Sequence, residues 1–147
     1  MRDFCRRHFI LTMAGSIPPL LTSVGKAVAA EAVKIRSLWG DRGTFSDVAQ
    51  NLNGKSVEMR GYMAPPLKPE IDFFVLTRIP MGVCPFCDTE ASWPDDLVVV
   101  YMEKSLQPVS FNDLITVTGK LELGTKTDAN TGFVSRIRLM QGEFARV

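Results

Sequence analysis

The second half of the sequence predicts a mainly β fold. Five segments after residue 55 show the alternation or the short apolar runs that are typical of strands. Gly61 and Gly119 lie inside two of them, at positions where a strand could bend around a closed barrel. A long connection and a final hairpin complete the pattern. Together these features predict a five-stranded OB-like Greek-key barrel with a short helix. An open antiparallel sheet with one helix is the simpler alternative.

The short helix is expected at Asp47–Leu52. Thr44 or Ser46 could cap its N-terminus, and Asp47 places a carboxylate at the positive end of the helix dipole. Asn53-Gly54 is a typical turn sequence and predicts the end of the helix. The residues before the cap, 31–43, are expected to be a polar lead-in to the domain.

The expected strands follow the helix and are separated by loops. They are residues 57–63, 72–79, 96–102, 114–123 and 133–144. The third contains the apolar run 97–100, which is continuous enough to predict burial on both faces. Residues 64–69 hold three prolines and should form a loop, because proline cannot continue a central strand. Residues 124–132 are expected to be the hairpin loop.

The N-terminal segment has the form of an export signal. Its basic start includes the pair Arg6 and Arg7, followed by Phe9 and a weakly apolar stretch, and it ends in small residues that include Ala27 and Ala29. Twin arginines with modest hydrophobicity are typical of signals for the twin-arginine pathway. We therefore expect the twin-arginine export machinery as a partner and an exported, periplasmic location.

The same segment sets the expected domain boundaries. We expect a signal peptide at residues 1–29 and a single OB-like β domain at residues 30–147, with cleavage after Ala30 as a near alternative. An anchoring helix is the other interpretation. The apolar stretch is shorter than the roughly 20 residues that a membrane span needs, and it contains two prolines. We therefore expect no stable membrane span after processing.

Charge and histidine content exclude several classes of function. The signal holds four of the 17 basic residues and one of the 16 acidic ones, so the remainder is slightly acidic, unlike a nucleic-acid-binding domain. The only histidine, His8, lies in the signal. The remaining chain therefore has no imidazole for a hydrolytic triad or for a histidine-rich metal site. Arg136 and Arg138 are expected to share one strand face, in solvent or against an acidic ligand.

Cys84-Pro85-Phe86-Cys87 is the clearest chemical motif, and a metal site is its first interpretation. Two thiolates with the Met81 thioether would form a set of soft ligands that suits copper(I). Zinc would need about four ligands. Neighbouring acidic residues or a second subunit could supply the rest; the acidic candidates are Asp88, Glu90, Asp95 and Asp96.

Two other interpretations of this motif stay open. Thiol–disulfide exchange is one, since Cys-x-x-Cys pairs can cycle between oxidised and reduced forms. The usual redox fold places a long helix after the pair, whereas Trp93-Pro94 leaves room here for about one helical turn. A structural disulfide between Cys84 and Cys87 is the other, since exported proteins readily form such bonds.

Several short segments resemble a family of small uncharacterised bacterial exported proteins with OB-like barrels and twin-arginine-type signals. The matching residues are Leu52-Asn53-Gly54-Lys55-Ser56-Val57, Gly61-Tyr62-Met63-Ala64-Pro65, Phe74-Val75-Leu76, Gly82-Val83-Cys84 and Val98-Val99-Val100. The resemblance covers about half of the expected domain. It implies a fold and an envelope address, and no established activity.

The expected function is that of a non-catalytic envelope module. It would bind or assist an envelope protein partner, and it could handle copper(I) or zinc through Met81, Cys84 and Cys87. No nucleic-acid partner is expected. A small periplasmic thiol–disulfide oxidoreductase is the alternative from a different class.

Overall fold

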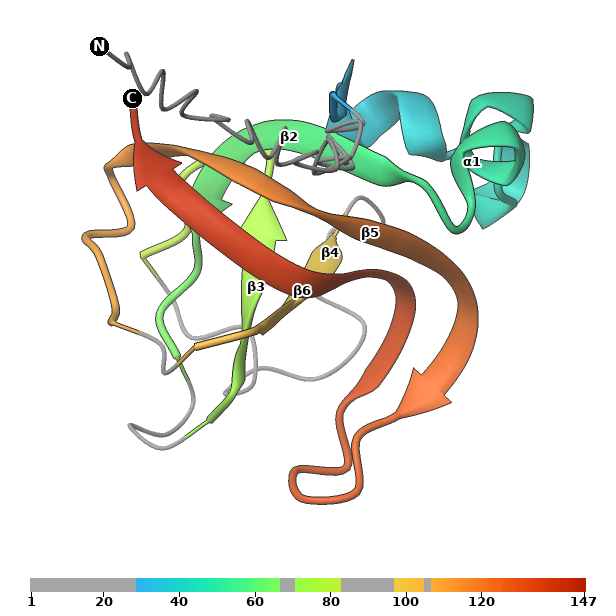
Figure 1. The fold of residues 1–147 in the computed structure, drawn as a ribbon. Coiled ribbons are helices and arrows are strands. Elements are labelled where there is room, and N and C mark those ends of the chain that lie inside the picture. The colour runs from blue at the N-terminus through green and yellow to red at the C-terminus, as the bar shows by residue number, and fades with distance from the viewer. Residues whose placement is uncertain (1–28, 67–70, 83–96, 105–106) are drawn as a thin grey trace, which may run out of the picture.

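The structure is a computed structural model that describes residues 29–66, 71–82, 97–104 and 107–147 (Figure 1). It contains six strands, two short 3₁₀ helices and one α-helix. In chain order they are β1 (Glu31–Val33), η1 (Ile35–Leu38), η2 (Asp41–Gly43), α1 (Asp47–Leu52), β2 (Ser56–Met63), β3 (Phe73–Thr77), β4 (Val98–Met102), β5 (Leu114–Thr127) and β6 (Val134–Arg146). None of the helices in these ranges has the length and apolar character that crossing a membrane requires.

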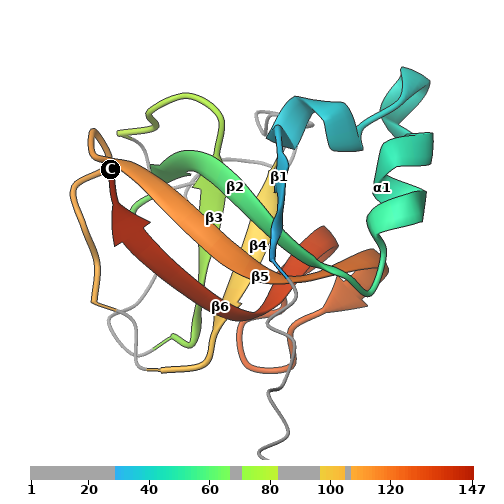
Figure 2. The same ribbon diagram turned by 45° about the horizontal axis from the view of Figure 1, so that its top comes forward.

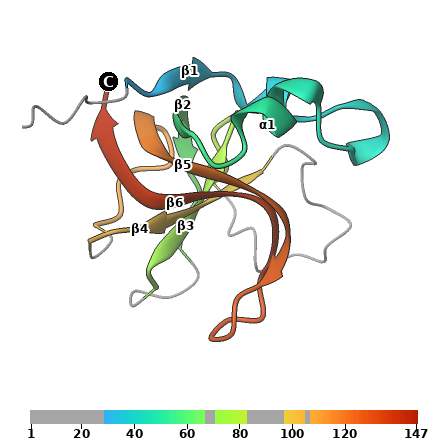
Figure 3. The same ribbon diagram turned by 45° about the vertical axis from the view of Figure 1, so that its right-hand side comes forward.

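All six strands belong to one mixed sheet in the order β1-β2-β3-β4-β6-β5. β2 also pairs with β5, so the row from β2 to β5 closes on itself. The pairings β1–β2 and β4–β6 are parallel and the others are antiparallel. Figure 2 shows β1 beside β2, with α1 next to the 3₁₀ helices, and Figure 3 shows how strongly β5 and β6 curve.

The expected number of strands was too low. Residues 31–43, expected to be a polar lead-in, contain β1 and both 3₁₀ helices. β1 has only three residues, too few to show an alternating pattern, and it is held by parallel pairing to residues 57–59 of β2. The observed hairpin loop is also shorter than the expected loop 124–132, because β5 continues to Thr127.

The expected helix is confirmed with the same bounds. Ser46 caps α1, since its Oγ accepts a hydrogen bond from the backbone N–H of Ala49 at 3.1 Å. The same hydroxyl donates to the carbonyl oxygen of Ser37 at 2.6 Å. The Ser46 side chain therefore caps the N-terminus of α1 and also connects α1 to η1.

The interior of the closed row holds the larger hydrophobic core. Alternate residues of β3 and β4, including Phe74, Leu76, Val98 and Val100, contribute to it. Their neighbours point to the other face of the sheet, as successive strand residues do, and join a second cluster. That outer cluster consists of Ala64, Phe73, Val75, Val99 and Phe133, with Leu97 and Tyr101 packed against it. Burial of residues 98–100 on both faces is therefore confirmed.

Gly61 and Gly119 allow close approaches between strands. A Cβ atom at Gly61 would lie 2.6 Å from the carbonyl oxygen of Thr77, so β2 can approach β3 only because this residue has no side chain. Gly119 lies at a register shift between β5 and β6, and its Cβ atom would be 3.0 Å from the Leu139 Cβ. Both glycines thus serve the curvature of the sheet.

Candidate functional site

The predicted metal ligands lie on the connection between β3 and β4. Cys84 and Cys87 fall outside the described residues, as do Arg6, Arg7, Phe9 and Ala27 of the predicted signal. Met81 is described and half-buried. Ala29, the last residue of the predicted signal, is exposed and lines a cavity together with residues of β5 and β6.

The connection that carries the cysteines has both ends at neighbouring positions of the sheet. Leu76, near the end of β3, pairs directly with Val98, the first residue of β4. On the β3 side, Gly82 lies so close to Phe111 that an added Cβ atom would be 3.2 Å from the ring. The residue next to Met81 therefore lies close to the ring of Phe111, which is itself exposed.

Within the ranges that the structure describes, no group of three or more His, Cys, Asp or Glu side chains could hold a metal ion. The thiol ligands proposed from the sequence are not among those residues. The metal prediction thus stays a prediction.

An aromatic group forms the centre of the outer cluster at the other end of the β3–β4 pair. Phe73 and Tyr101 are direct neighbours across the two strands, with ring centroids 5.2 Å apart. The ring centroid of Phe133, the residue directly before β6, lies 5.7 Å from that of Phe73. Phe73 and Phe133 are buried, whereas Tyr101 is half-buried and carries its hydroxyl toward the β5–β6 turn.

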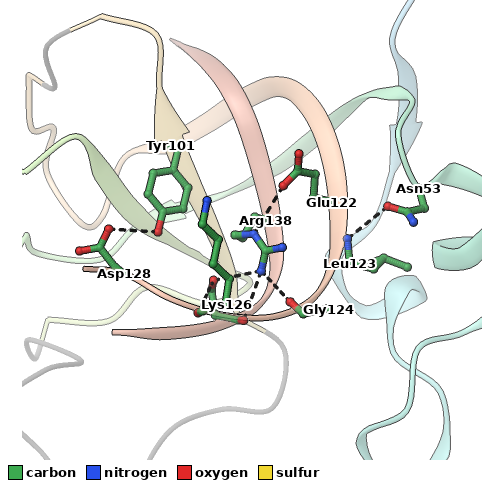
Figure 4. A network of polar contacts seen from close by, with 9 residues as sticks. Asn53, Tyr101, Glu122, Leu123, Gly124, Lys126, Asp128 and Arg138 are labelled. Atoms are coloured by element: carbon green, nitrogen blue, oxygen red, sulfur yellow. Dashed lines mark hydrogen bonds and ion pairs between the residues drawn. The ribbon is translucent and has the colours of Figure 1, made fainter. Parts of the chain in front are cut away.

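Tyr101 connects this aromatic group to charged residues of the β5–β6 hairpin (Figure 4). Its hydroxyl donates to Asp128 Oδ2 at 3.4 Å, and Lys126 Nζ lies 5.2 Å from the centre of its ring. Such a cation over an aromatic face is favourable, more so where water is excluded. The three side chains therefore form one polar group at the margin of the outer cluster.

Asp128 also shapes the hairpin turn. Its Oδ1 accepts hydrogen bonds from the backbone N–H of Asn130 at 3.1 Å and of Thr131 at 2.9 Å, and from the Thr131 hydroxyl at 2.8 Å. Burial acts to raise the pKa of the Asp128 carboxyl, but the hydrogen bonds from the turn and from Tyr101 outweigh it and lower the pKa below 3.8. Asp128 is therefore a carboxylate near neutral pH.

The phenol of Tyr101 responds in the opposite direction. Burial, and then the charge and hydrogen bond of Asp128, raise the pKa of the Tyr101 phenol above 10.0. Near neutral pH this group is a neutral hydrogen-bond donor. The arrangement can therefore orient a polar ligand through the Tyr101 hydroxyl and the Asp128 carboxylate.

Arg138 is buried, contrary to the expectation of a shared open face with Arg136. Its Nη1 donates to the carbonyl oxygen of Gly124 at 2.6 Å and to the carbonyl and hydroxyl oxygens of Ser135, both at 3.3 Å. Its Nε lies 3.7 Å from Glu122 Oε2, an ion-pair distance that is too long for a hydrogen bond. The sharp bend of β5 folds over this side chain and covers it.

Arg136 is exposed, and its guanidinium packs on aromatic side chains. Its guanidinium lies over two rings, 5.2 Å from the centre of Trp39 and 5.3 Å from that of Phe45. The two rings are themselves 6.0 Å apart, across an isolated bridge between these residues. The Arg136 side chain thus holds the loop of η2 against β6.

Sequence reasoning did not find the Tyr101–Asp128 pair. The two residues are 27 positions apart, and only the closing of the hairpin onto β4 brings them together. A local signal was available for Asp128 alone. An aspartate at the start of Asp128-Ala129-Asn130-Thr131-Gly132 is typical of a turn in which the carboxylate accepts hydrogen bonds from backbone N–H groups.

Together, the closed row of strands and the absence of a regular helical layer in the described ranges define a mainly β protein with a mixed sheet. Neither a protein-family model nor a curated protein sequence matches the chain. A crystal structure of a DUF3299 family protein from Pseudomonas aeruginosa PAO1 has a similar fold, with a TM-score of 0.54 at 14% identity, over 81% of this chain and 97% of that one. This likeness to a bacterial protein concerns the fold.

A second solved structure has a lower score. It is a provisionally assigned aspartyl-tRNA synthetase from Leishmania major Friedlin, with a TM-score of 0.45 at 13% identity, over 90% of this chain and 23% of that one.

Proposed function

We propose that this chain is exported and acts outside the cytoplasm as a non-catalytic binding or accessory module with an OB-like barrel. The closed row β2-β3-β4-β6-β5 supports the barrel, because it has five strands with a Greek-key order and strongly curved members. The single observation that carries the binding role is the Tyr101 group. It places an aromatic face, a carboxylate and a cation together on the outside of the barrel.

The position of this group supports the assignment of the binding face. In OB barrels, ligands contact the face of the second and third strands and the adjoining loops. Counted from β2, those strands are β3 and β4, and the β5–β6 turn is one of the adjoining loops. Tyr101, Lys126 and Asp128 would therefore touch a ligand of the barrel. The slightly acidic composition disfavours an oligonucleotide as that ligand.

The metal-handling part of the proposal assigns Met81, Cys84 and Cys87 as ligands of copper(I) or zinc. It is supported by the anchoring of both ends of their connection at the Leu76–Val98 pair. Met81 is half-buried, and its neighbour Gly82 lies close to the Phe111 ring. Three sulfur donors suit copper(I), and zinc would need a further ligand.

Elemental analysis of protein purified without oxygen tests the metal assignment. We expect stoichiometric metal in the wild type and loss of the metal in Cys84→Ser and in Cys87→Ser. Met81→Ala should retain less metal than the wild type but more than either cysteine variant. Met140→Leu is the control, because it removes a thioether that lies outside the proposed ligand set and should keep the metal. A metal-free protein with a Cys84–Cys87 disulfide would contradict the metal assignment and leave a structural bond.

A dithiol–disulfide exchange assay separates the binding module from the alternative, a small periplasmic oxidoreductase. The binding module should show no catalytic turnover of a disulfide substrate. Turnover that disappears in Cys84→Ser would replace the proposal with the redox function.

Export is tested with the arginine pair. The double variant Arg6→Lys with Arg7→Lys should remain in the cytoplasm, because the twin-arginine pathway reads the pair as an address. Arg2→Lys is the control for a change of basic residue outside the pair. Unchanged export of the double variant would contradict the assignment of the chain to the twin-arginine pathway.

A further inference from the structure

One edge of β2 changes its partner partway along the strand. Residues 57–59 pair with β1, whereas Tyr62 and Met63 pair with β3. Arg60 lies between these two pairings. The other edge of β2 pairs with β5 along this stretch. A cavity of about 440 Å³ opens at this position, within the range of about 300–1,000 Å³ that is usual for small-molecule sites. We call it the β1–β3 cleft, and its surroundings are seen in Figure 2.

The β1–β3 cleft combines an apolar floor with a cationic rim. The apolar residues are Ala32, Val33 and Ile35, and the charged ones are Lys34, Arg36, Glu58, Arg60 and Arg78. Val33 packs on the main core, and Ile35 belongs to it and is 2% exposed. The floor is therefore a fixed part of the domain, while the four basic side chains, all exposed, outnumber one carboxylate.

The fold alone brings these residues together. On β2 the outward residues Glu58 and Arg60 alternate with buried Val57 and Met59, so the charged pair faces away from the core. Parallel pairing places Ala32 of β1 beside Glu58. Arg78 directly follows Thr77, which pairs with Tyr62. Three separate segments thus contribute charge to one small cavity.

We propose that the β1–β3 cleft binds a small amphipathic anion, with an apolar body and one carboxylate or phosphate head. The apolar body would lie against Ala32 and Val33, where burial of apolar surface is favourable. The head would lie between Arg36 and Arg60, since guanidinium groups pair with carboxylate and phosphate oxygens through two parallel hydrogen bonds. Lys34 adds a third positive charge at the same rim.

A second cavity lacks this combination. It measures about 680 Å³, is bordered by β5, β6 and the starts of β1 and β2, and is lined by three glutamates and two lysines. Its charges nearly balance, and its position is separate from β3. Lys55 and Lys120 on that cavity therefore provide matched controls for changes of basic residues at the β1–β3 cleft.

Calorimetric titration with three ligands of one chain length tests the proposal. Decanoate and decyl phosphate should bind saturably with a stoichiometry of one, and decyltrimethylammonium should not, because it reverses the charge of the head. A preference between the two anions identifies the head group. Absence of saturable binding of both anions, or equal binding of the cation, would overturn the proposal.

Charge and shape variants locate the site. Arg36→Glu and Arg60→Glu should each weaken anion binding about tenfold or more, the size expected for losing a charged hydrogen-bond donor. Ala32→Phe should abolish binding by filling the floor, and Arg60→Lys should retain part of it. Lys55→Glu and Lys120→Glu should bind like the wild type.

Two further measurements keep the result interpretable. An unchanged melting temperature of each variant shows that lost binding is not lost folding, and Arg60→Lys provides a second variant with little effect on packing. Wild-type affinity in both arginine-to-glutamate variants would overturn the assignment. The Cys84→Ser variant should keep full anion binding, so this proposal and the metal assignment can fail separately.

Discussion

The buried guanidinium of Arg138 donates a hydrogen bond of 2.6 Å to the carbonyl oxygen of Gly124. Gly124 has a φ of 112° and lies within the register shift between Leu123 and Lys126, where β5 bends. A residue with a side chain would be strained there. The arginine on β6 therefore holds the bend of β5, and the two strands depend on each other at this point.

Arg138→Met should lower the free energy of unfolding by about 2 kcal/mol, because it removes charged hydrogen bonds and leaves buried carbonyl oxygens without a donor. Urea denaturation measures the change. Arg146→Met is the control on the same strand, since its ion pair with Asp113 is largely exposed and should contribute less than about 1 kcal/mol. Equal losses in both variants would contradict the role of Arg138.

Gly61→Ala should destabilise the domain by about 2 kcal/mol, a usual size for overpacking. The new Cβ atom would be 2.6 Å from a backbone oxygen of Thr77, which cannot move without displacing β3. The neighbouring change Arg60→Ala affects an exposed side chain and should be nearly neutral in the same denaturation experiment. A neutral Gly61→Ala would show that β2 and β3 are farther apart than described.

The Asp128 carboxyl should make stability depend on pH in the acid range. The pKa of this carboxyl is lowered in the folded state. Its contribution to the free energy of unfolding is therefore fully present above its ordinary pKa of 3.8, and it is lost as the pH falls through the folded pKa. Urea midpoints measured from about pH 6 down to about pH 2.5 should therefore fall less steeply in Asp128→Asn than in the wild type. Identical profiles would contradict the role of the carboxylate.

Ser46→Ala should cost about 2 kcal/mol, since it removes both the cap of α1 and the bond to Ser37. Ser46→Asp keeps an acceptor for the Ala49 N–H and loses only the donor to Ser37. It should therefore recover about half of the lost free energy of unfolding. If the aspartate variant is as unstable as the alanine variant, capping contributes little here.

Elements with a local signal could be predicted from the sequence. The capping serine and the Asn53-Gly54 turn predicted α1 with the correct bounds. The apolar run 97–100 predicted a strand buried on both faces, which is confirmed for residues 98–100, whereas Leu97 is half-buried and precedes β4. The locations of β2 to β6 followed from alternation and turn residues. β1 escaped prediction because three residues carry too little pattern and its pairing with β2 is long-range.

The sequence by itself determined where most strands and the helix lie, because capping, turn chemistry and alternation act between near neighbours. Only the tertiary structure decided which strands pair, and with that the parallel contact of β4 with β6 and the closure of β2 on β5. The same long-range register buried Arg138, joined Tyr101 to Asp128 and gathered the basic residues of the β1–β3 cleft. Two residues far apart in the chain meet only when the pairing of whole strands brings them together. Alternation along one strand determines which of its residues face the core, but not which distant strand lies beside it.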